Sequence, residues 1–266
     1  MKGHLYLTCG CDGAGRSALR EQSFCAPFHL SKPHQDAGAL VVNVVNPTAG
    51  IFDGDELEMV VRVETGARLV VTTPSANRVY QSRSGGAARV RQVVRAAAGS
   101  FVEFIPEPLI PQAGAVYEQE TLLEAEAGAE LLFFEWLSPG RVASGEVFQY
   151  RRLGWRTDVR VAGKLVARER YQLLPGRPET IATLTARFPQ AHYLGCFWVT
   201  DRPFPVAAVE ALGEPGIYLG WSALAAGGWT VKVLGADALA TRRCLTRLRE
   251  VLYASTDRVP PRLGRW

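Results

Sequence analysis

From Leu57 to Val71 the chain reads Leu-Glu-Met-Val-Val-Arg-Val-Glu-Thr-Gly-Ala-Arg-Leu-Val-Val. Apolar and polar residues largely alternate as far as Val63, a small turn follows at Gly66, and a second apolar run follows Arg68. Alternation with a period of two predicts a strand with one buried face, and a glycine between two such runs predicts a tight turn. The stretch therefore predicts a strand–turn–strand unit.

The same unit occurs twice more, at intervals of roughly 30 residues. The paired runs are Val90–Val94 with Phe101–Ile105 and Thr121–Leu123 with Glu130–Trp136, and their turns lie at Gly99 and Gly128. Phe101–Ile105 alternates too little to face water, so we expect this run to be buried on both faces. Units that stack on one another predict a mainly β fold, either an elongated β-solenoid or a sandwich-like scaffold.

The rest of the chain indicates more strands and few helices. Further strands are expected at Leu5–Thr8, Phe148–Leu153, Thr157–Val161, Leu165–Leu174, Tyr193–Thr200, Ile217–Ala223 and Trp229–Leu234, with a hairpin at Gly163. Pro205 suits the first turn of a short helix over Val206–Leu212, and Asp237 suits the N-cap of a longer helix. Because no linker interrupts the composition, we expect one β-rich domain over residues 1–266, with a C-terminal helix at about 237–254. The tail Val259–Trp266, with two adjacent prolines, is not expected to be helical.

Composition and charge argue against two classes of partner. The formal net charge is only +4, and no dense Lys/Arg run with interleaved aromatic residues appears, so a nucleic-acid partner is not expected. No apolar run approaches the ~20 residues of a membrane span, and the N-terminus lacks the apolar core of a signal peptide. The five cysteines are an odd number in a chain of this size, which favours free thiols and a cytoplasmic location.

The N-terminal region contains the residues that could form the active site of an enzyme. The segment from Gly10 to Ser17 nearly fits the phosphate-loop pattern, but Arg16 replaces its lysine, and Pro27 interrupts the helix that should follow. A glycine-rich hairpin explains the segment better. A loose set of soft metal ligands also lies here, namely His4, Cys9, Cys11, Cys25, His29 and His34. A metal- or nucleotide-dependent enzyme built on this region remains the alternative hypothesis, although no nucleophile motif supports an enzyme.

Three loops contain more prolines, glycines and polar side chains than a simple connection between strands requires. Asn46–Asp55 combines a proline, two glycines and two carboxylates, and the other two loops contain Thr72-Thr73-Pro74 and Pro106-Glu107-Pro108. Prolines and glycines fix the backbone, so these segments are either the corners of a β-solenoid or functional loops. Asp53 and Asp55 flank Gly54, and this spacing fits paired carboxylates as well as an ordinary turn.

Four segments in order resemble the UreD/UreH family of urease accessory proteins. Asn46–Leu57 is similar to its Pro-x-Gly-Gly-Ile-x-x-Gly-Asp-x-Leu signature, and Thr72–Ser82 to its Thr-Thr-Pro-x-x-x-(Lys/Arg)-x-Tyr-x-Ser loop. Glu103–Ala115 and Gly140–Glu146 resemble its Pro-(Glu/Gln)-x-x-Ile…Gly-Ala and Gly-Arg-x-x-x-Gly-Glu segments. The matching loop residues include Gly50, Gly54, Thr72, Thr73, Pro74, Tyr80, Pro106, Arg141 and Gly145. Ala49 and Asp53 depart from the pattern, because both stand where the family often has glycine.

The resemblance implies a largely β-stranded protein that is not an enzyme. Such a protein acts as a scaffold or chaperone, joins the accessory protein UreF and the GTPase UreG, and docks on apo-urease during nickel insertion. It also implies a water-filled route for nickel in transit and no tightly bound cofactor. Carboxylates release a metal more readily than a closed thiolate cage would. The candidates for this route are the carboxylates of the family-like loops, Asp53, Asp55, Glu107 and Glu146.

Overall fold

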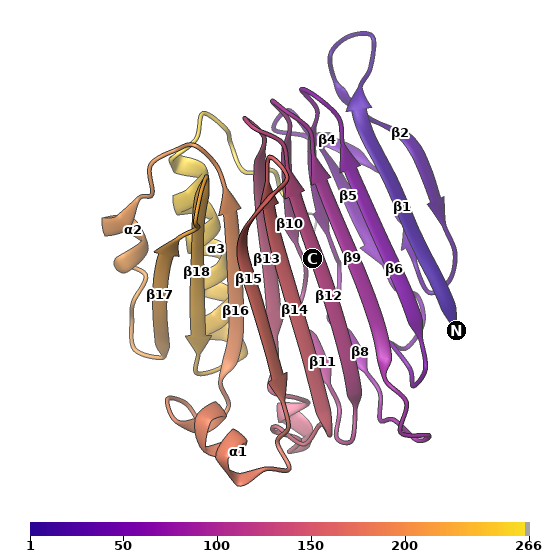
Figure 1. Ribbon diagram of the computed structural model, residues 1–266, viewed down its shortest axis with the longest axis vertical. Coiled ribbons are helices and arrows are strands. Elements are labelled where there is room, and N and C mark those ends of the chain that lie inside the picture. The colour runs from indigo at the N-terminus through magenta and orange to yellow at the C-terminus, as the bar shows by residue number, and fades with distance from the viewer. Residues whose placement is uncertain (264–266) are drawn as a thin grey trace.

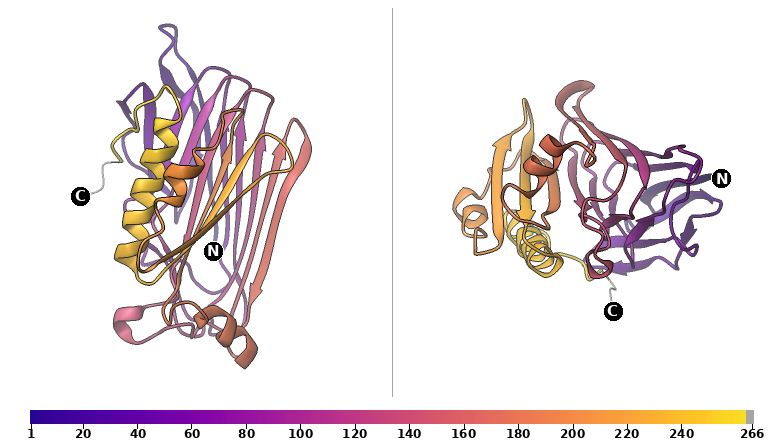
Figure 2. Two further views of the ribbon diagram at one scale, coloured as in Figure 1. Left: turned by 90° about the vertical axis from the view of Figure 1, so that its left-hand side faces the viewer. Right: turned by 90° about the horizontal axis from the view of Figure 1, so that it is seen from below.

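The structure is a computed structural model that describes residues 1–263. Strands dominate these residues and form two sheets that stack on each other, with helices in minor roles (Figures 1 and 2). One sheet has seven strands and the other has eleven. The prediction of a mainly β protein with few helices is confirmed.

The first sheet is largely parallel. Its strands, in spatial order, are β15 (Lys164–Leu173), β14 (Arg152–Val161), β12 (Val116–Ala125), β9 (Ala88–Ala96), β6 (Glu56–Val63), β1 (Lys2–Cys11) and β2 (Ser17–Phe24). The five inner strands run parallel to one another, and the two edge strands β2 and β15 are antiparallel to their neighbours. β14 and β15 join at Gly163, which confirms the hairpin predicted there.

The second sheet joins a parallel half to an antiparallel half. The parallel strands are β5 (Ala39–Val45), β7 (Arg68–Thr72), β10 (Phe101–Ile105) and β13 (Glu130–Leu137). The antiparallel strands are β16 (His192–Val199), β18 (Gly228–Gly235) and β17 (Ile217–Ala223). The short strands β3 (His29–Leu30), β4 (His34–Asp36), β8 (Asn77–Val79) and β11 (Leu109–Pro111) complete the sheet.

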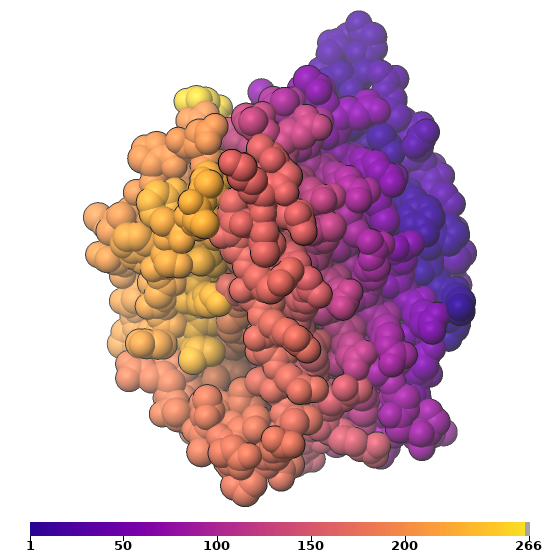
Figure 3. Space-filling model, in the orientation of Figure 1, coloured from indigo at the N-terminus to yellow at the C-terminus, as the bar shows by residue number. Residues whose placement is uncertain are grey.

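Each predicted strand–turn–strand unit crosses from one sheet to the other. The first strand of a unit lies in the first sheet and the second strand in the second sheet, so successive units stack as the coils of a β-solenoid. The turn glycines Gly66, Gly99 and Gly128 have φ angles of 76°, 69° and 75°, a backbone conformation that only glycine adopts at no steric cost. These turns lie together at the upper end of Figure 1, which we call the turn end, and the β1–β2 hairpin projects beyond them (Figures 1 and 3).

The main core fills the space between the sheets. Inward residues such as Val61, Val94 and Leu123 of the first sheet pack in one cluster with Leu69 and Val102 of the second. Every residue of β10 is buried, as its sequence predicted. Parallel strands that are covered on both sides are typical of such uninterrupted apolar runs.

The C-terminal helix α3 (Ala238–Ala254) covers the outer face of the second sheet (Figure 2). Its N-cap is Asp237, whose side chain accepts a hydrogen bond from the Ala240 amide at 2.8 Å, as predicted. A buried ion pair fixes the helix to β10, because Arg249 donates two hydrogen bonds, of 2.5 and 2.7 Å, to the fully buried Glu103. The hydroxyl of Tyr253 donates a third at 2.7 Å, so the carboxylate is well satisfied.

Four features of the secondary structure differ from the sequence predictions. Phe148–Leu153 was expected to be a strand, but Phe148 has a positive φ of 51° and the chain enters a strand only at β14. The helix α1 (Pro178–Thr185) was not predicted, and α2 (Val206–Glu210) is shorter than expected, because neither segment has a long apolar face. A single 3₁₀ turn, η1 (Val142–Ser144), was also not predicted.

The tail is non-helical as far as residue 263, and its last three residues lie outside the described part of the chain. Within residues 1–263, no helix combines the length and the apolar character needed to cross a membrane.

Candidate functional site

The four family-like segments meet at the lower end of Figure 1, which we call the loop end. They hydrogen-bond to one another in chain order. The Ile51 amide donates to the carbonyl of Arg78 at 2.8 Å, and the Gln112 amide donates to that of Val79 at 2.9 Å. The Ala113 amide then donates to the carboxylate of Glu146 at 3.0 Å. The loops therefore form a stacked layer that closes one end of the solenoid.

Glycines in these loops allow close backbone approach. At Gly50, φ is 156°, and a Cβ atom there would lie 2.5 Å from the carbonyl oxygen of Arg78. Gly54 has a φ of 73° in the turn before β6, and Gly145 has a φ of 74° as the C-cap of η1. The glycines of the motif thus have a structural explanation, which is that side chains would strain or block the layer.

The polar motif residues also join one loop to the next. Thr72 donates through its hydroxyl to the carbonyl of Ile105 at 2.8 Å, and the hydroxyl of Thr73 accepts from the Glu107 amide at 2.8 Å. Tyr80 stacks on Phe52 with their ring centroids 4.8 Å apart. Pro74 is in the bend before β8, and Pro106 borders an interior cavity.

The four predicted carboxylates lie at the loop end, and each has a partner within the chain. Asp55 is only 2% exposed and accepts from the N-terminal amine of Met1 at 2.6 Å. Asp53 accepts from the Ser84 amide at 2.6 Å, and backbone hydrogen bonds, of which that one is the strongest, lower its pKa. The spacing of these two carboxylates therefore serves a turn and an N-terminal anchor.

The other two carboxylates form ion pairs with arginines. Glu146 binds Arg141, and this hydrogen-bonded pair lowers the pKa of the carboxyl. Glu107 accepts from Arg242 of α3 at 2.8 Å and thereby links the loop end to the C-terminal helix. Within residues 1–263, no group of three or more His, Cys, Asp or Glu side chains is arranged to hold a metal ion. The role of these four carboxylates in a nickel route stays a prediction.

A narrow cavity of about 70 Å³ runs between the two sheets near the loop end. Its walls are mostly apolar and aromatic, but polar side chains enter it from both sheets and from the loops, namely Asn46, Thr73, Asn77, Gln92, Glu107, Gln119 and Glu135. A buried water needs about 10–15 Å³ of such space and two or more polar partners, so the cavity has room for a few waters. Glu107 is thus the member of the predicted set that reaches this interior.

Glu135 of β13 is the most unusual residue of the cavity. It is only 2% exposed, and its carboxylate accepts from the indole of Trp155 at 2.8 Å and from the hydroxyl of Thr157 at 3.2 Å. Burial raises the pKa of Glu135 to about 7, with the charge of Glu169 adding to the effect. The carboxyl therefore exchanges its proton near neutral pH.

Polar groups continue from Glu135 toward the surface. The Tyr193 hydroxyl lies 3.4 Å from Glu135 and 3.3 Å from Glu169 of β15, so it connects the two carboxyls. Glu169 in turn pairs with Lys232 of β18, whose side chain is 48% exposed. Nearby, the buried hydroxyl of Tyr171 has no hydrogen-bond partner among the residues that the structure describes. We call Glu135, Glu169, Tyr193 and Lys232, together with the cavity, the interior polar path.

The sequence reasoning missed the interior polar path. Its one local signal was a carboxylate inside the apolar run of β13, where Glu135 follows Phe133 and Phe134. Further signals were Gln92 of β9 and Gln119 of β12, because each is polar at a position whose sheet face is otherwise buried. A buried polar group is more informative than an exposed one, since it needs a specific reason to be there.

The N-terminal motif is a hairpin. Gly10–Ser17 connects the antiparallel strands β1 and β2, and no helix follows it, which confirms the glycine-rich hairpin interpretation. His192 of β16 is buried, accepts from the Trp136 indole at 3.2 Å, and has its pKa lowered by burial to about 4. Of the N-terminal soft ligands, His4 and Cys25 are in contact, with a ring nitrogen 3.2 Å from the sulfur.

Comparison with known proteins gives consistent results. The model of the UreD urease accessory protein family matches residues 1–265. A protein of Opitutus terrae named urease accessory protein UreD is 40% identical over 263 residues, which covers 97% of this chain and 96% of the relative. Proteins of the same name from Actinomyces naeslundii and Acetivibrio thermocellus are 33% and 26% identical, over 80% and 90% of this chain and 78% and 93% of theirs.

Proposed function

The chain belongs to the UreD family of urease accessory proteins, and we propose that it acts as a non-enzymatic scaffold during nickel insertion into apo-urease. In this role it works in the cytoplasm, without a tightly bound cofactor, and with nickel passing through as cargo. Its partners are a UreF-like protein, a UreG-like GTPase and the urease apoprotein. Neither nucleic acid nor a membrane is a partner in this proposal.

The observation that carries the proposal furthest is the interior polar path. Its cavity begins at the loop end, where Glu107 reaches it, and its polar groups continue past Glu135 to Glu169 near the surface. Polar side chains inside a β core cost free energy unless they are satisfied or used. A path for a hydrated cation explains why this core contains them.

The chemistry of Glu135 suits a cation in transit. A metal ligand must be deprotonated, so binding of a divalent cation displaces a proton from the carboxyl. Because the pKa of Glu135 is about 7, both the loss of its proton to bind a cation and the return of the proton when the cation leaves cost little free energy near neutral pH. Gln119 lines the same cavity and Thr157 contacts Glu135. The side-chain oxygens of both are weak ligands, and a site of this kind releases nickel more readily than thiolates would.

The four loop carboxylates keep a place in the proposal as the entrance to this path. Glu107 borders the cavity directly, whereas Asp53, Asp55 and Glu146 shape the loops around it. Passing nickel would have to compete with the arginines that pair with Glu107 and Glu146. We therefore place the main nickel contact at Glu135 and assign the loop carboxylates mainly to holding the entrance open.

Co-expression tests the proposal directly. Urease subunits and the UreF-like and UreG-like proteins are produced with and without this chain, in nickel-supplemented cells. We expect urease purified from cells that contain the chain to carry nickel and to be active, and urease from cells without it to carry little nickel. Equal nickel content and activity in both preparations would refute the proposal.

A further inference from the structure

A thiol and an imidazole lie together at the edge of the first sheet. Cys25 follows the end of β2, and its sulfur lies 3.2 Å from Nδ1 of His4 on the neighbouring strand β1. The other ring nitrogen, Nε2, lies 2.9 Å from the hydroxyl of Ser23. The ring also stacks on Tyr6, with centroids 4.6 Å apart and an angle of 23° between the rings. Three neighbours therefore fix the position of the imidazole.

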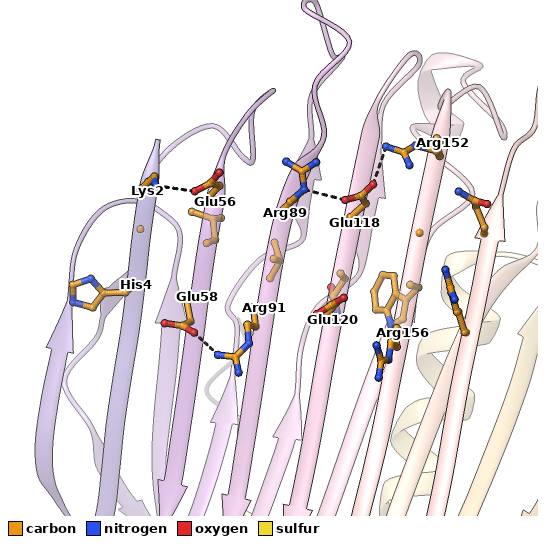
Figure 4. Close-up of a pocket in the computed structure, with 18 of the residues that line it drawn as sticks. Lys2, His4, Glu56, Glu58, Arg89, Arg91, Glu118, Glu120, Arg152 and Arg156 are labelled. Atoms are coloured by element: carbon orange, nitrogen blue, oxygen red, sulfur yellow. Dashed lines mark hydrogen bonds and ion pairs between the residues drawn. The ribbon is translucent and has the colours of Figure 1, made fainter. Parts of the chain in front are cut away.

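The pair is accessible from solvent. Ser23 and Cys25 are exposed, and His4 stands at the rim of a groove of about 870 Å³ on the outer face of the first sheet. Figure 4 shows that the imidazole points from β1 toward the sheet edge, away from the rows of Glu and Arg side chains. A small reagent can therefore reach the sulfur without any opening of the fold.

The titratable side chains around the imidazole come from three strands. They are Tyr6 on β1, Glu58 on β6 and Arg91 on β9, and Cys25 faces the ring from the side of β2. Tyr6 donates to Glu58 at 2.5 Å, and Glu58 also pairs with Arg91. This arrangement occupies the Glu58 carboxylate, and Cys25 and Ser23 are the hydrogen-bonding partners of His4.

The remaining cysteines have different surroundings. Cys9, Cys196 and Cys244 are buried. Burial raises the pKa of the Cys9 thiol to about 12 and that of Cys244 to about 11, and it also raises the pKa of Cys196. These three thiols stay protonated at neutral pH and are shielded from reagents. Cys11 is half-buried near the hairpin tip and provides an internal comparison.

We propose that Cys25 and His4 form a reactive-thiol site that exchanges with small disulfides. A nucleophile within hydrogen-bond reach of a base, with the base held by a third group, is the arrangement that activates a side chain for attack. Here the nucleophile is Cys25, the base is His4 and the holding group is Ser23. The inference does not depend on the proposed role in nickel insertion.

The exchange step is balanced. His4 accepts the proton of the Cys25 thiol, and the thiolate attacks one sulfur of the small disulfide. A new S–S bond forms as the old one breaks, so Cys25 becomes a mixed disulfide. The released half of the reagent keeps the electron pair of the broken bond and leaves as a thiolate, and His4 passes its proton to this thiolate or to the solvent.

The test uses the full-length protein and two disulfides, dithiobis(nitrobenzoate) and glutathione disulfide. Release of the coloured thiolate gives the rate with the first reagent, and peptide mass spectrometry assigns the modified cysteine with both. We expect Cys25 to be modified first. We expect His4→Gln to slow its modification about tenfold at pH 7, a modest share of what a positioned base typically contributes. Cys11→Ser is the matched control and should leave the fast phase unchanged.

Measuring the rate of Cys25 modification at a second pH distinguishes loss of a base from a structural change caused by His4→Gln. At pH 9 an ordinary thiol is largely ionised without help, so the difference between His4→Gln and the wild type should narrow to about twofold. Circular dichroism checks that both proteins are folded. The proposal is overturned if Cys25 reacts no faster than Cys11, if His4→Gln leaves the rate at pH 7 unchanged, or if the defect persists in full at pH 9.

Discussion

Replacing Glu135 by glutamine should stabilise the protein, and only at high pH. The substitution keeps the shape of the side chain. Its amide oxygen can accept from Trp155 and Thr157 as the carboxylate does, and its amide nitrogen can face the Tyr193 hydroxyl. The main change is therefore the loss of an ionisable group at a buried site.

The magnitude follows from the pKa of Glu135. The value is about 7 in the folded protein and 4.5 for an ordinary glutamate, a difference worth about 3 kcal/mol. Because the folded-state pKa is raised, the favourable contribution of the protonated carboxyl is complete below pH 4.5 and is lost as the pH rises through 7. Glu135→Gln should therefore match the wild type at pH 4 and exceed its free energy of unfolding by up to about 3 kcal/mol at pH 8.

Urea denaturation at a series of pH values measures this difference. The matched control is Glu120→Gln, which removes an exposed carboxylate from the outer face of β12. We expect the control to change stability by less than about 0.5 kcal/mol at any pH, as surface substitutions usually do. A constant difference in the free energy of unfolding between Glu135→Gln and the wild type from pH 4 to pH 8 would contradict this prediction. It would show that the carboxyl is not held in its protonated form by burial.

Two further predictions concern how α3 is attached and how it begins. Arg249→Leu leaves the buried Glu103 without its cation and should lower the free energy of unfolding, measured by urea denaturation, by about 3–5 kcal/mol. Adding Glu103→Leu should recover most of this loss. A further loss in the double variant would contradict the prediction. Asp237→Ala removes the N-cap bond to the Ala240 amide and should cost about 1 kcal/mol, whereas an unchanged melting temperature would show that the cap is not needed.

The sequence predicted the elements better than their arrangement in space. Period-two alternation around Gly66, Gly99 and Gly128 was enough to locate the repeated units, because each turn is local. The distribution of the two strands of a unit between two sheets depends on long-range pairing, such as that of β6 with β9, and short-range patterns do not contain it. The fold class could be predicted, whereas the interior could not.

The difference between local patterns and long-range contacts also explains which parts of the candidate site could be predicted. The loop motifs could be located from the residues, but the partners of the carboxylates could not, because Asp55 binds the N-terminal amine and Glu107 binds an arginine of α3. Those contacts join residues 54 and 135 positions apart in the sequence. The interior polar path likewise depends on the register that places Gln119 beside Trp155 across β12 and β14.

In the proposed function nickel reaches urease through the interior of this chain, so the nickel content of matured urease measures that transfer. Urease is matured in cells that produce the UreF-like and UreG-like proteins together with wild-type chain, Glu135→Gln or Glu120→Gln, and its metal content is measured after purification. We predict that Glu135→Gln still co-purifies with its partners but yields urease with severalfold less nickel, while Glu120→Gln supports full loading. Equal nickel content in urease matured with Glu135→Gln and with the wild type would refute transfer through the interior polar path.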